Sequence, residues 1–427
     1  MAGLLKKNCS DNSLFKNILK LISGEGVGRA IGFLAAPVIT RLYTTSDFGI
    51  VAVFGSICVL LYPFLSLKYS LSIPLHRTET AAVNSIAACL LVLVINTVII
   101  TLTFLFFHSQ ILSFFSSGII DSLWGYIPLT FFFCGLSEIL SYYSTRQRDF
   151  TTIAKVSIVQ KLTGALIKIF LGLLHCHVIG LLTGSLFAAS GGLSLYFRVY
   201  WKRLKDGFHR VSLRKICFVI RRYKEFPLYR VPSHLLLKVS GSLPILYFAW
   251  HFGTDTTGQI SLAMSMLSVP VSIACTSVGR AFYGEIASLG QEKNKEISVM
   301  TGRIMIKLFA ISIVPFMVIV VFGPWIFSTY FGSEWIQSGV FARYLCFYLI
   351  FRFVYSPISD GIFNVFERQK SVLWLETSRV VIVISSLFIS WLCNCSVDKT
   401  VIVYSLSLSI QYIFSIIMVF YILRKSS

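Results

Sequence analysis

Charged side chains inside long apolar runs are the residues best placed to do chemistry in this sequence. Glu25 and Arg29 lie in the run Gly24-Glu-Gly-Val-Gly-Arg29. Four residues separate them, so on a helix they share a face in the order that favours an ion pair. The flanking glycines would let a backbone or a ligand approach closely. A charge in a membrane-spanning segment needs a partner, water or a ligand, so this pair is either a binding site or a buried structural pair.

Cations recur at matching positions in the two halves of the chain. Lys238 lies in an apolar run with no acidic residue within a helical turn, and it follows Arg29 by 209 residues. Lys68 and Arg280, each at the end of an apolar run, are also nearly equivalent. These four cations predict a central cavity that focuses its field on an anionic ligand, such as a pyrophosphate or an acidic sugar. For Lys68 and Arg280, ordinary snorkelling at a helix end is the alternative.

Other charges inside apolar runs predict mainly structural pairs. Glu376 and Arg379 are three residues apart, and Asp360 follows Arg352 by about two helical turns. The remaining members of this set are Glu138, Lys161, Lys168, Arg303, Lys307 and Arg343. Asp360, Glu25 and Glu138 are the candidates for binding a coupling proton or sodium ion. No other cofactor is expected.

Prolines fall near the middle of four apolar runs. They are Pro37, Pro63, Pro244 and Pro270. Proline interrupts the helical hydrogen-bond ladder and permits bending. We therefore expect bendable helices, which would suit alternating access.

The elements that carry these residues are membrane-spanning helices. The chain is 56% hydrophobic and 13% charged, whereas soluble domains are about 45–50% apolar and about 25% charged. A spanning helix needs roughly 20 mostly apolar residues. The twelve candidates are residues 16–42, 47–67, 82–107, 124–145, 152–174, 177–200, 229–250, 256–280, 299–323, 339–366, 371–393 and 400–423. The sequence therefore predicts an all-α integral membrane protein.

The distribution of basic residues predicts the orientation. Connections such as 108–123 and 324–338 contain no lysine or arginine, whereas the alternate connections carry Arg146, Arg148, Lys293 and Lys295. The positive-inside rule then places both termini in the cytoplasm. It also explains the net charge of +20 without a nucleic-acid partner.

The connection from 201 to 228 is unusually basic. Within it, Leu213, Ile216, Cys217 and Ile220 share one helical face, and arginines and lysines occupy the other. This pattern predicts an amphipathic helix in the cytoplasmic interface that binds anionic lipids. A solvated linker between the two halves is the alternative.

The two halves repeat each other weakly. Tyr43-Thr-Thr-Ser-Asp-Phe-Gly49 precedes the second expected helix, and Phe252-Gly-Thr-Asp-Thr-Thr-Gly258 precedes the eighth. Arg146-Gln-Arg148 and Arg368-Gln-Lys370 follow the fourth and the tenth. We therefore expect two pseudo-symmetric six-helix lobes, 1–200 and 229–427, joined by the basic connector 201–228.

Enzyme motifs are missing from the sequence. His175-Cys-His177 is the closest approach to a metal-ligand spacing, and two histidines in a short loop are more simply interfacial polar residues. No glycine-rich loop precedes Lys-Ser/Thr, which excludes an ATP motor within this chain. We expect no enzymatic activity and no metal site.

Two stretches resemble the polysaccharide flippase family, which includes O-antigen transporters. They are Phe33-Leu-Ala-Ala-Pro-Val-Ile-Thr-Arg-Leu-Tyr-Thr-Thr-Ser-Asp-Phe-Gly49 and Lys68-Tyr-Ser-Leu-Ser-Ile-Pro-Leu75. The resemblance implies a V-shaped two-lobe bundle with a central cavity. It also implies transfer of an undecaprenyl-pyrophosphate-linked repeat unit across a bacterial inner membrane, for lipopolysaccharide or similar surface polysaccharide export. Arg29, Lys238 and Arg280 would be its cationic cavity residues, although Glu25 departs from a purely cationic cavity.

The hypothesis is therefore a lipid-linked oligosaccharide flippase that works by alternating access. A glycan polymerase and a chain-length regulator are the expected protein partners. The alternatives are a cation-expelling multidrug antiporter of the same superfamily, a membrane glycan polymerase or acyltransferase, and a scaffold for glycosyltransferases. Cations at Arg29 and Lys238 disfavour the antiporter, and short outer connections disfavour the enzymes.

Overall fold

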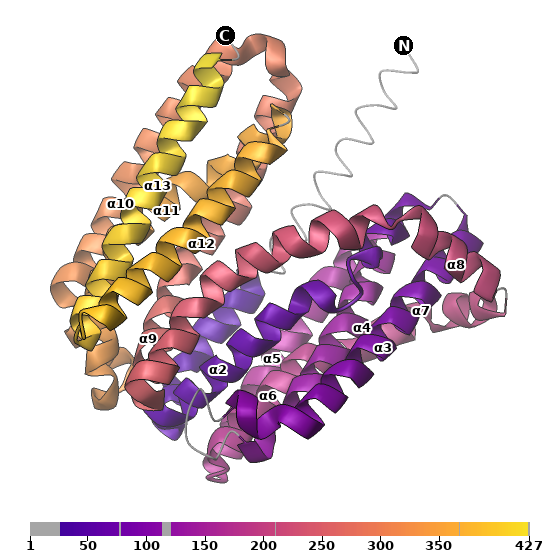
Figure 1. Ribbon diagram of the computed structural model, residues 1–427, viewed down its shortest axis with the longest axis horizontal. Helices are drawn as coiled ribbons and strands as arrows, with labels where there is room; N and C mark the ends of the chain where they lie inside the picture. Colours follow the sequence, from indigo (N-terminus) through magenta and orange to yellow (C-terminus); the bar gives the residue numbers. More distant parts are fainter. Residues whose placement is uncertain (1–25, 77, 113–120, 210, 367, 426–427) are drawn as a thin grey trace. The chain divides into compact units, whose positions relative to one another are not determined.

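The computed structural model describes residues 26–76, 78–112, 121–209, 211–366 and 368–425. Throughout these residues the regular structure is helical, and no strand is present (Figure 1). The chain divides into two compact units: residues 1–43 with 54–235 form unit 1, and residues 44–53 with 236–427 form unit 2. This division into units does not test the predicted boundaries of the two lobes, which stay a prediction.

Unit 1 begins with a helix whose described part covers residues 26–42. Its further elements are the second part of α2 (Thr45–Leu61), η1 (Tyr62–Phe64), η2 (Tyr69–Leu75), α3 (Glu79–Leu112), η3 (Asp121–Leu123), α4 (Tyr126–Arg146), α5 (Phe150–Leu173), α6 (His177–Ser190), α7 (Leu193–Phe208), α8 (Leu213–Arg222) and η4 (Phe226–Arg230). Inside it, Tyr143, Tyr196 and Phe131 are almost completely buried.

Unit 2 contains the first part of α2 and nearly all of α9 (Val231–Leu289). Its other elements are η5 (Gln291–Lys293), α10 (Asn294–Phe331), η6 (Ser333–Trp335), α11 (Ile336–Val365), α12 (Gln369–Leu392) and α13 (Val397–Lys425). The last four helices form one bundle, with α11 packed against both α10 and α13 (Figure 1).

The expected membrane protein of about twelve spans agrees with the helices. By length and composition, nine helical segments of the described chain can cross a membrane. One of them contains α9, which is two helices joined across a kink at Gly253 (φ 84°). The helix of residues 26–42 and α4 fall outside those nine. Counting α9 twice and adding these two helices gives the expected number.

The four prolines do not occupy equivalent places. Pro37 lies inside the helix of residues 26–42, and Pro244 and Pro270 lie inside α9. Pro63 lies in η1, beyond the last residue of α2. The expectation of a mid-helix proline is therefore wrong at Pro63, which ends a helix because its ring removes a backbone donor.

Candidate functional site

Lys68 forms the best-defined polar contact among the predicted cavity residues. Its Nζ lies 3.5 Å from Oε1 of Glu138 on α4, and the Ser70 hydroxyl donates to the same oxygen over 2.9 Å. The two charged side chains are only 13% and 19% exposed. Lys68 also has a left-handed backbone (φ 62°), which is unusual for a residue other than glycine. Lys68 is therefore an ion-pair partner within unit 1, and the snorkelling alternative stays a prediction.

Arg29 lies on a helix that packs closely against α5. A Cβ added at the neighbouring Gly28 would lie 3.3 Å from Lys161 Cγ and 3.5 Å from Ser157 Oγ. Arg29 itself is half-buried, and Lys161 is exposed. The sequence did not connect these two cations, because about 130 residues separate them. The packing of Gly28 against Lys161 places the helix that carries Arg29 beside α5 within unit 1.

The structure gives less detail for the remaining predicted cavity residues, Glu25, Lys238 and Arg280. Glu25 lies outside the described residues, so its pairing with Arg29 stays a prediction. Lys238 is half-buried on α9 in unit 2. Arg280 is also on α9, but its side chain lies outside the description. The joint cationic cavity therefore stays a prediction.

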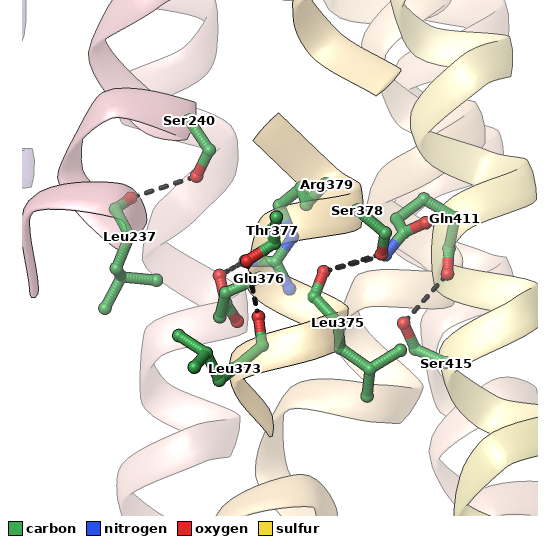
Figure 2. Close-up of polar contacts among 10 residues, drawn as sticks. All are labelled: Leu237, Ser240, Leu373, Leu375, Glu376, Thr377, Ser378, Arg379, Gln411 and Ser415. Carbon is green, nitrogen blue, oxygen red and sulfur yellow. Dashed lines mark hydrogen bonds and ion pairs between the residues drawn. The ribbon is translucent and has the colours of Figure 1, made fainter. Parts of the chain in front are cut away.

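A charged and aromatic cluster lies inside unit 2. Arg379 on α12 pairs with Glu376 through an Nη1–Oε2 distance of 2.9 Å, which confirms the predicted pair (Figure 2). Its guanidinium carbon also lies 5.2 Å from the ring centroid of Tyr412 on α13. One turn away, Gln411 donates to the Leu375 carbonyl over 3.1 Å and thereby links α13 to α12 (Figure 2). Arg379 is held by charge and by an aromatic face together.

Four tyrosines surround this cluster, and sequence reasoning missed all of them. Tyr348 stacks on Tyr412 with 6.3 Å between ring centroids, Tyr404 packs edge-on to Tyr348, and Tyr355 lies 5.9 Å from Tyr412. Arg352 on α11 interacts electrostatically with Tyr348, Tyr404 and Tyr412. Tyrosines within apolar runs look like ordinary core or lipid-facing residues, so nothing in the sequence separated these four.

Asp360 lies next to the same cluster. It is exposed on α11, and both it and Glu376 interact electrostatically with Tyr355. Among the described residues, its carboxylate has no ion pair within 4.0 Å, so pairing with Arg352 is not seen. Asp360 thus lies near the carboxylate of Glu376, which is itself paired with Arg379 in unit 2. Such a group can hold a cation or a proton where one carboxylate is left without a salt-bridge partner.

The two repeated motifs contact each other within unit 2. The Thr45 hydroxyl donates to Asp255 over 2.8 Å, and the hydroxyl oxygens of Ser46 and Thr254 are also 2.8 Å apart. A Cβ at Gly49 would lie 1.9 Å from the Thr254 carbonyl oxygen, and one at Gly258 would lie 1.8 Å from that of Thr45. The contact is reciprocal, because Thr254 and Gly258 are the repeat equivalents of Thr45 and Gly49. A self-complementary contact of this kind is typical of two-fold symmetry.

No metal site is formed by the part of the chain that the structure describes. Its histidine, cysteine, aspartate and glutamate side chains do not gather in groups of three or more. His177 begins α6, and His175 and His177 both have positive φ values. These two histidines belong to the turn between α5 and α6.

Comparison with known families gives one match. The sequence matches the family described as polysaccharide biosynthesis protein over residues 38–340. No curated protein matches it.

Solved structures of transporters have a similar fold at low sequence identity. An inward-facing multidrug resistance MATE family transporter of the MOP superfamily gives a TM-score of 0.66 at 15% identity, over 92% of this chain and 95% of that one. The lipid II flippase MurJ, in an inward closed conformation, gives 0.60 at 12% identity, over 97% and 90%. A MOP superfamily transporter from Pyrococcus furiosus, described as having a binding pocket of reverse polarity, gives 0.58 at 15% identity, over 96% of each chain.

Proposed function

Because this chain belongs to the polysaccharide biosynthesis protein family, we propose that it is a flippase for lipid-linked oligosaccharides. It would move an undecaprenyl-pyrophosphate-linked repeat unit, such as an O-antigen unit, to the outer leaflet of a bacterial inner membrane. The family match over residues 38–340 is the observation that carries this proposal, and the transporter fold is consistent with it. Both termini would be cytoplasmic, and a glycan polymerase and a chain-length regulator would act next.

The charge balance supports an anionic substrate. Within the spans of the described chain, cations outnumber carboxylates, and Glu138 is already paired with Lys68. Arg29 and Lys238 are therefore the residues we assign to the diphosphate, with Arg280 as a further candidate. Lys68 contributes less, because Glu138 offsets its charge. A cationic drug would meet repulsion at the same positions, which disfavours the multidrug antiporter.

The coupling ion is best assigned to unit 2. Glu138 has two partners in Lys68 and Ser70, whereas Asp360 is exposed and has the Glu376 carboxylate near it. A proton or a sodium ion would therefore bind at Asp360 and bias the two states of the transporter, since a ligand shifts an equilibrium only through differential affinity. Asp360→Asn should abolish the response of transport to the ion gradient. A variant that keeps this response would exclude the assignment.

Genetic complementation tests the proposal. The gene is deleted and then restored as wild type, Arg29→Ala or Lys238→Ala at matched protein levels. We expect deletion to abolish surface glycan while intact lipid-linked units accumulate inside, and the two variants to behave like the deletion. If single units still reach the surface and only chain length suffers, the protein is not the flippase and acts in polymerisation instead.

A further inference from the structure

Helix α8 is fixed to unit 1 by one narrow face. Ile216 and Val219 are buried against Ala87 and Ala88 of α3. The Ser212 amide at the start of α8 donates to the Asn84 side chain of α3 over 3.1 Å. Near its end, the Ile220 carbonyl accepts from the Tyr69 hydroxyl over 3.4 Å. A solvated linker would not make such a set of contacts, so α8 has a defined orientation on α3 (Figure 1).

The opposite face of α8 is exposed and basic. We call this the α8 basic face, and it consists of Arg214, Lys215, Phe218, Arg221 and Arg222. Phe218 is 61% exposed in the middle of it. The ten residues of α8 contain four basic residues and no acidic one. The expected apolar face is split, because Ile216 is buried on α3 while Leu213 and Cys217 are exposed.

The position of α8 along α3 indicates the depth of α8 in the membrane. With 34 residues, α3 is about 51 Å long and exceeds a hydrocarbon core of about 30 Å, so about 10 Å projects at each end when it is centred. At 1.5 Å per residue, the projecting part is roughly the first seven residues of α3, starting at Glu79. Helix α8 packs just beyond this part, at Ala87 and Ala88. The exposed apolar side chains of α3 begin at Leu91, about 4.5 Å further on. With α3 centred in the bilayer, α8 would therefore lie where the lipid headgroups meet the hydrocarbon.

We infer that the α8 basic face is a binding surface for anionic phospholipid headgroups. Basic side chains near an anionic membrane surface each contribute roughly 1 kcal/mol, which is about fivefold in a local binding constant. Phe218 would enter the boundary between headgroups and acyl chains, as aromatic residues of interfacial helices do. An acidic soluble protein would match the positive charge of the α8 basic face, but it would not reach a surface that lies among the lipid headgroups. None of the residues of the α8 basic face is assigned to the proposed substrate, so the inference does not depend on that substrate.

A spin label on Cys217, which is next to Phe218 in the sequence, reports on the surroundings of the α8 basic face. Cys217 is exposed on α8, and the other cysteines are replaced so that it alone is labelled. The full-length protein is placed in nanodiscs of phosphatidylcholine alone or of phosphatidylcholine with phosphatidylglycerol. Collision of the label with oxygen, which partitions into lipid, is compared with collision with a water-soluble nickel chelate. We expect the ratio of oxygen to nickel collisions to rise several-fold when anionic lipid is present, because lipids held by the basic side chains exclude the chelate from the label while α8 keeps its place on α3.

Two charge variants decide what the rise means. Replacing Arg214, Lys215, Arg221 and Arg222 by glutamine should abolish the dependence on anionic lipid. Replacing the exposed Lys293, Lys295, Arg368 and Lys370 by glutamine removes the same charge elsewhere and should leave it unchanged. Thermal unfolding in phosphatidylcholine checks that both variants are folded. The inference is overturned if the collision ratio is the same in both lipids. It is also overturned if the ratio still rises with anionic lipid in the glutamine variant of the α8 basic face.

Discussion

Lys68 and Glu138 are both largely shielded from solvent, and they form an ion pair with each other. Their carboxylate–ammonium distance of 3.5 Å is modest, but Ser70 adds a second donor to the same oxygen. Breaking a buried pair by removing one partner costs more than removing both, because a lone charge is left in an apolar environment. The pair therefore has a testable signature.

We expect Lys68→Met and Glu138→Gln each to destabilise the protein by about 3 kcal/mol, and the double variant to be clearly more stable than either single variant. Thermal unfolding of the purified protein in detergent measures the three effects. The matched control is Lys293 with Glu296, an exposed pair whose side chains are 55% and 60% exposed and whose loss should cost roughly 0.3–0.5 kcal/mol. Additive effects at Lys68 and Glu138 would show that the two charges do not depend on each other.

His76 lies between η2 and α3, in contact with the end of α8. Its ring packs edge-on against Tyr223 at 5.6 Å, and its carbonyl accepts from Arg146 Nε over 3.1 Å. Burial lowers the pKa of His76 below its usual value of 6.5, and the positive charges of Arg146 and Arg222 lower it further. Neutral His76 is thus the form that the folded protein favours.

Stability should consequently fall on acidification. Below pH about 6.5 the unfolded chain binds a proton at this residue that the folded protein does not, so stability is lost as the pH falls through that value and levels off below the folded-state pKa. Histidine titrates over roughly pH 5.5 to 7.5. When the pH is lowered across this range, the unfolding midpoint of His76→Gln should fall less than that of the wild type. An unchanged slope would mean that His76 does not carry the effect.

The sequence could predict only part of the site at this scale. Glu376 and Arg379 are three residues apart, and local spacing was enough to pair them. Lys68 and Glu138 come from segments 70 residues apart, so no local pattern connects them. The tyrosines around Arg352 come from two helices, and their type does not distinguish them from core residues.

At the scale of elements, α8 shows how a helical pattern can be correct while the direction of its faces is wrong. The amphipathic helix predicted from Leu213, Ile216, Cys217 and Ile220 exists, but α3 covers Ile216 and not Leu213 or Cys217. The small side chains Ala87 and Ala88 allow this contact. A helical wheel gives the periodicity of α8 but does not contain the neighbour that buries it.

The reciprocal glycines of the repeated motifs lead to a sharper prediction. An alanine at Gly49 or Gly258 places a methyl group under 2 Å from a backbone oxygen, which no side-chain rotation relieves. We expect each variant to lose more than the roughly 1–3 kcal/mol typical of overpacking, with a matching fall in folded protein. Gly55→Ala on α2 and Gly241→Ala on α9 are the controls, because nothing lies within 4 Å of a Cβ there.

Fluorescence-detected size-exclusion chromatography with a temperature ramp separates these outcomes. The control variants should match or slightly exceed the wild type, since alanine favours helix over glycine by about 1 kcal/mol. Wild-type stability in both Gly49→Ala and Gly258→Ala would mean that the two motifs are not in tight contact.

At the scale of the whole molecule, the number and type of helices could be predicted because apolar length and composition reflect the solvent that each segment meets. Apolar length and composition could not predict which helices belong to which unit. The first turns of α2 belong to unit 2, where Phe48 packs edge-on against Trp335 with 4.9 Å between ring centroids. Contacts between residues so far apart in sequence leave no trace in hydropathy or in the spacing of the repeats.

We propose that the contact between the repeated motifs, which lies within unit 2, opens during transport. Cysteines at Ser46 and Thr254, whose hydroxyl oxygens are 2.8 Å apart, should form a disulfide in a variant without other cysteines. We expect oxidation of this double variant to stop transport and reduction to restore it, while Ser46→Cys alone stays active under both conditions. Full activity of the oxidised double variant would show that this contact stays closed throughout the cycle.

The most direct test of the central claim is flipping by the purified protein in liposomes. The vesicles contain an undecaprenyl-pyrophosphate-linked oligosaccharide, and an impermeant glycosidase outside cleaves only the units in the outer leaflet. The account predicts that the protein raises the cleaved fraction well above the outer-leaflet share, and that Arg29→Ala and Lys238→Ala, folded and at equal density, do not. If wild-type protein leaves the cleaved fraction at the level of protein-free vesicles under every imposed proton or sodium gradient, the flippase account is contradicted.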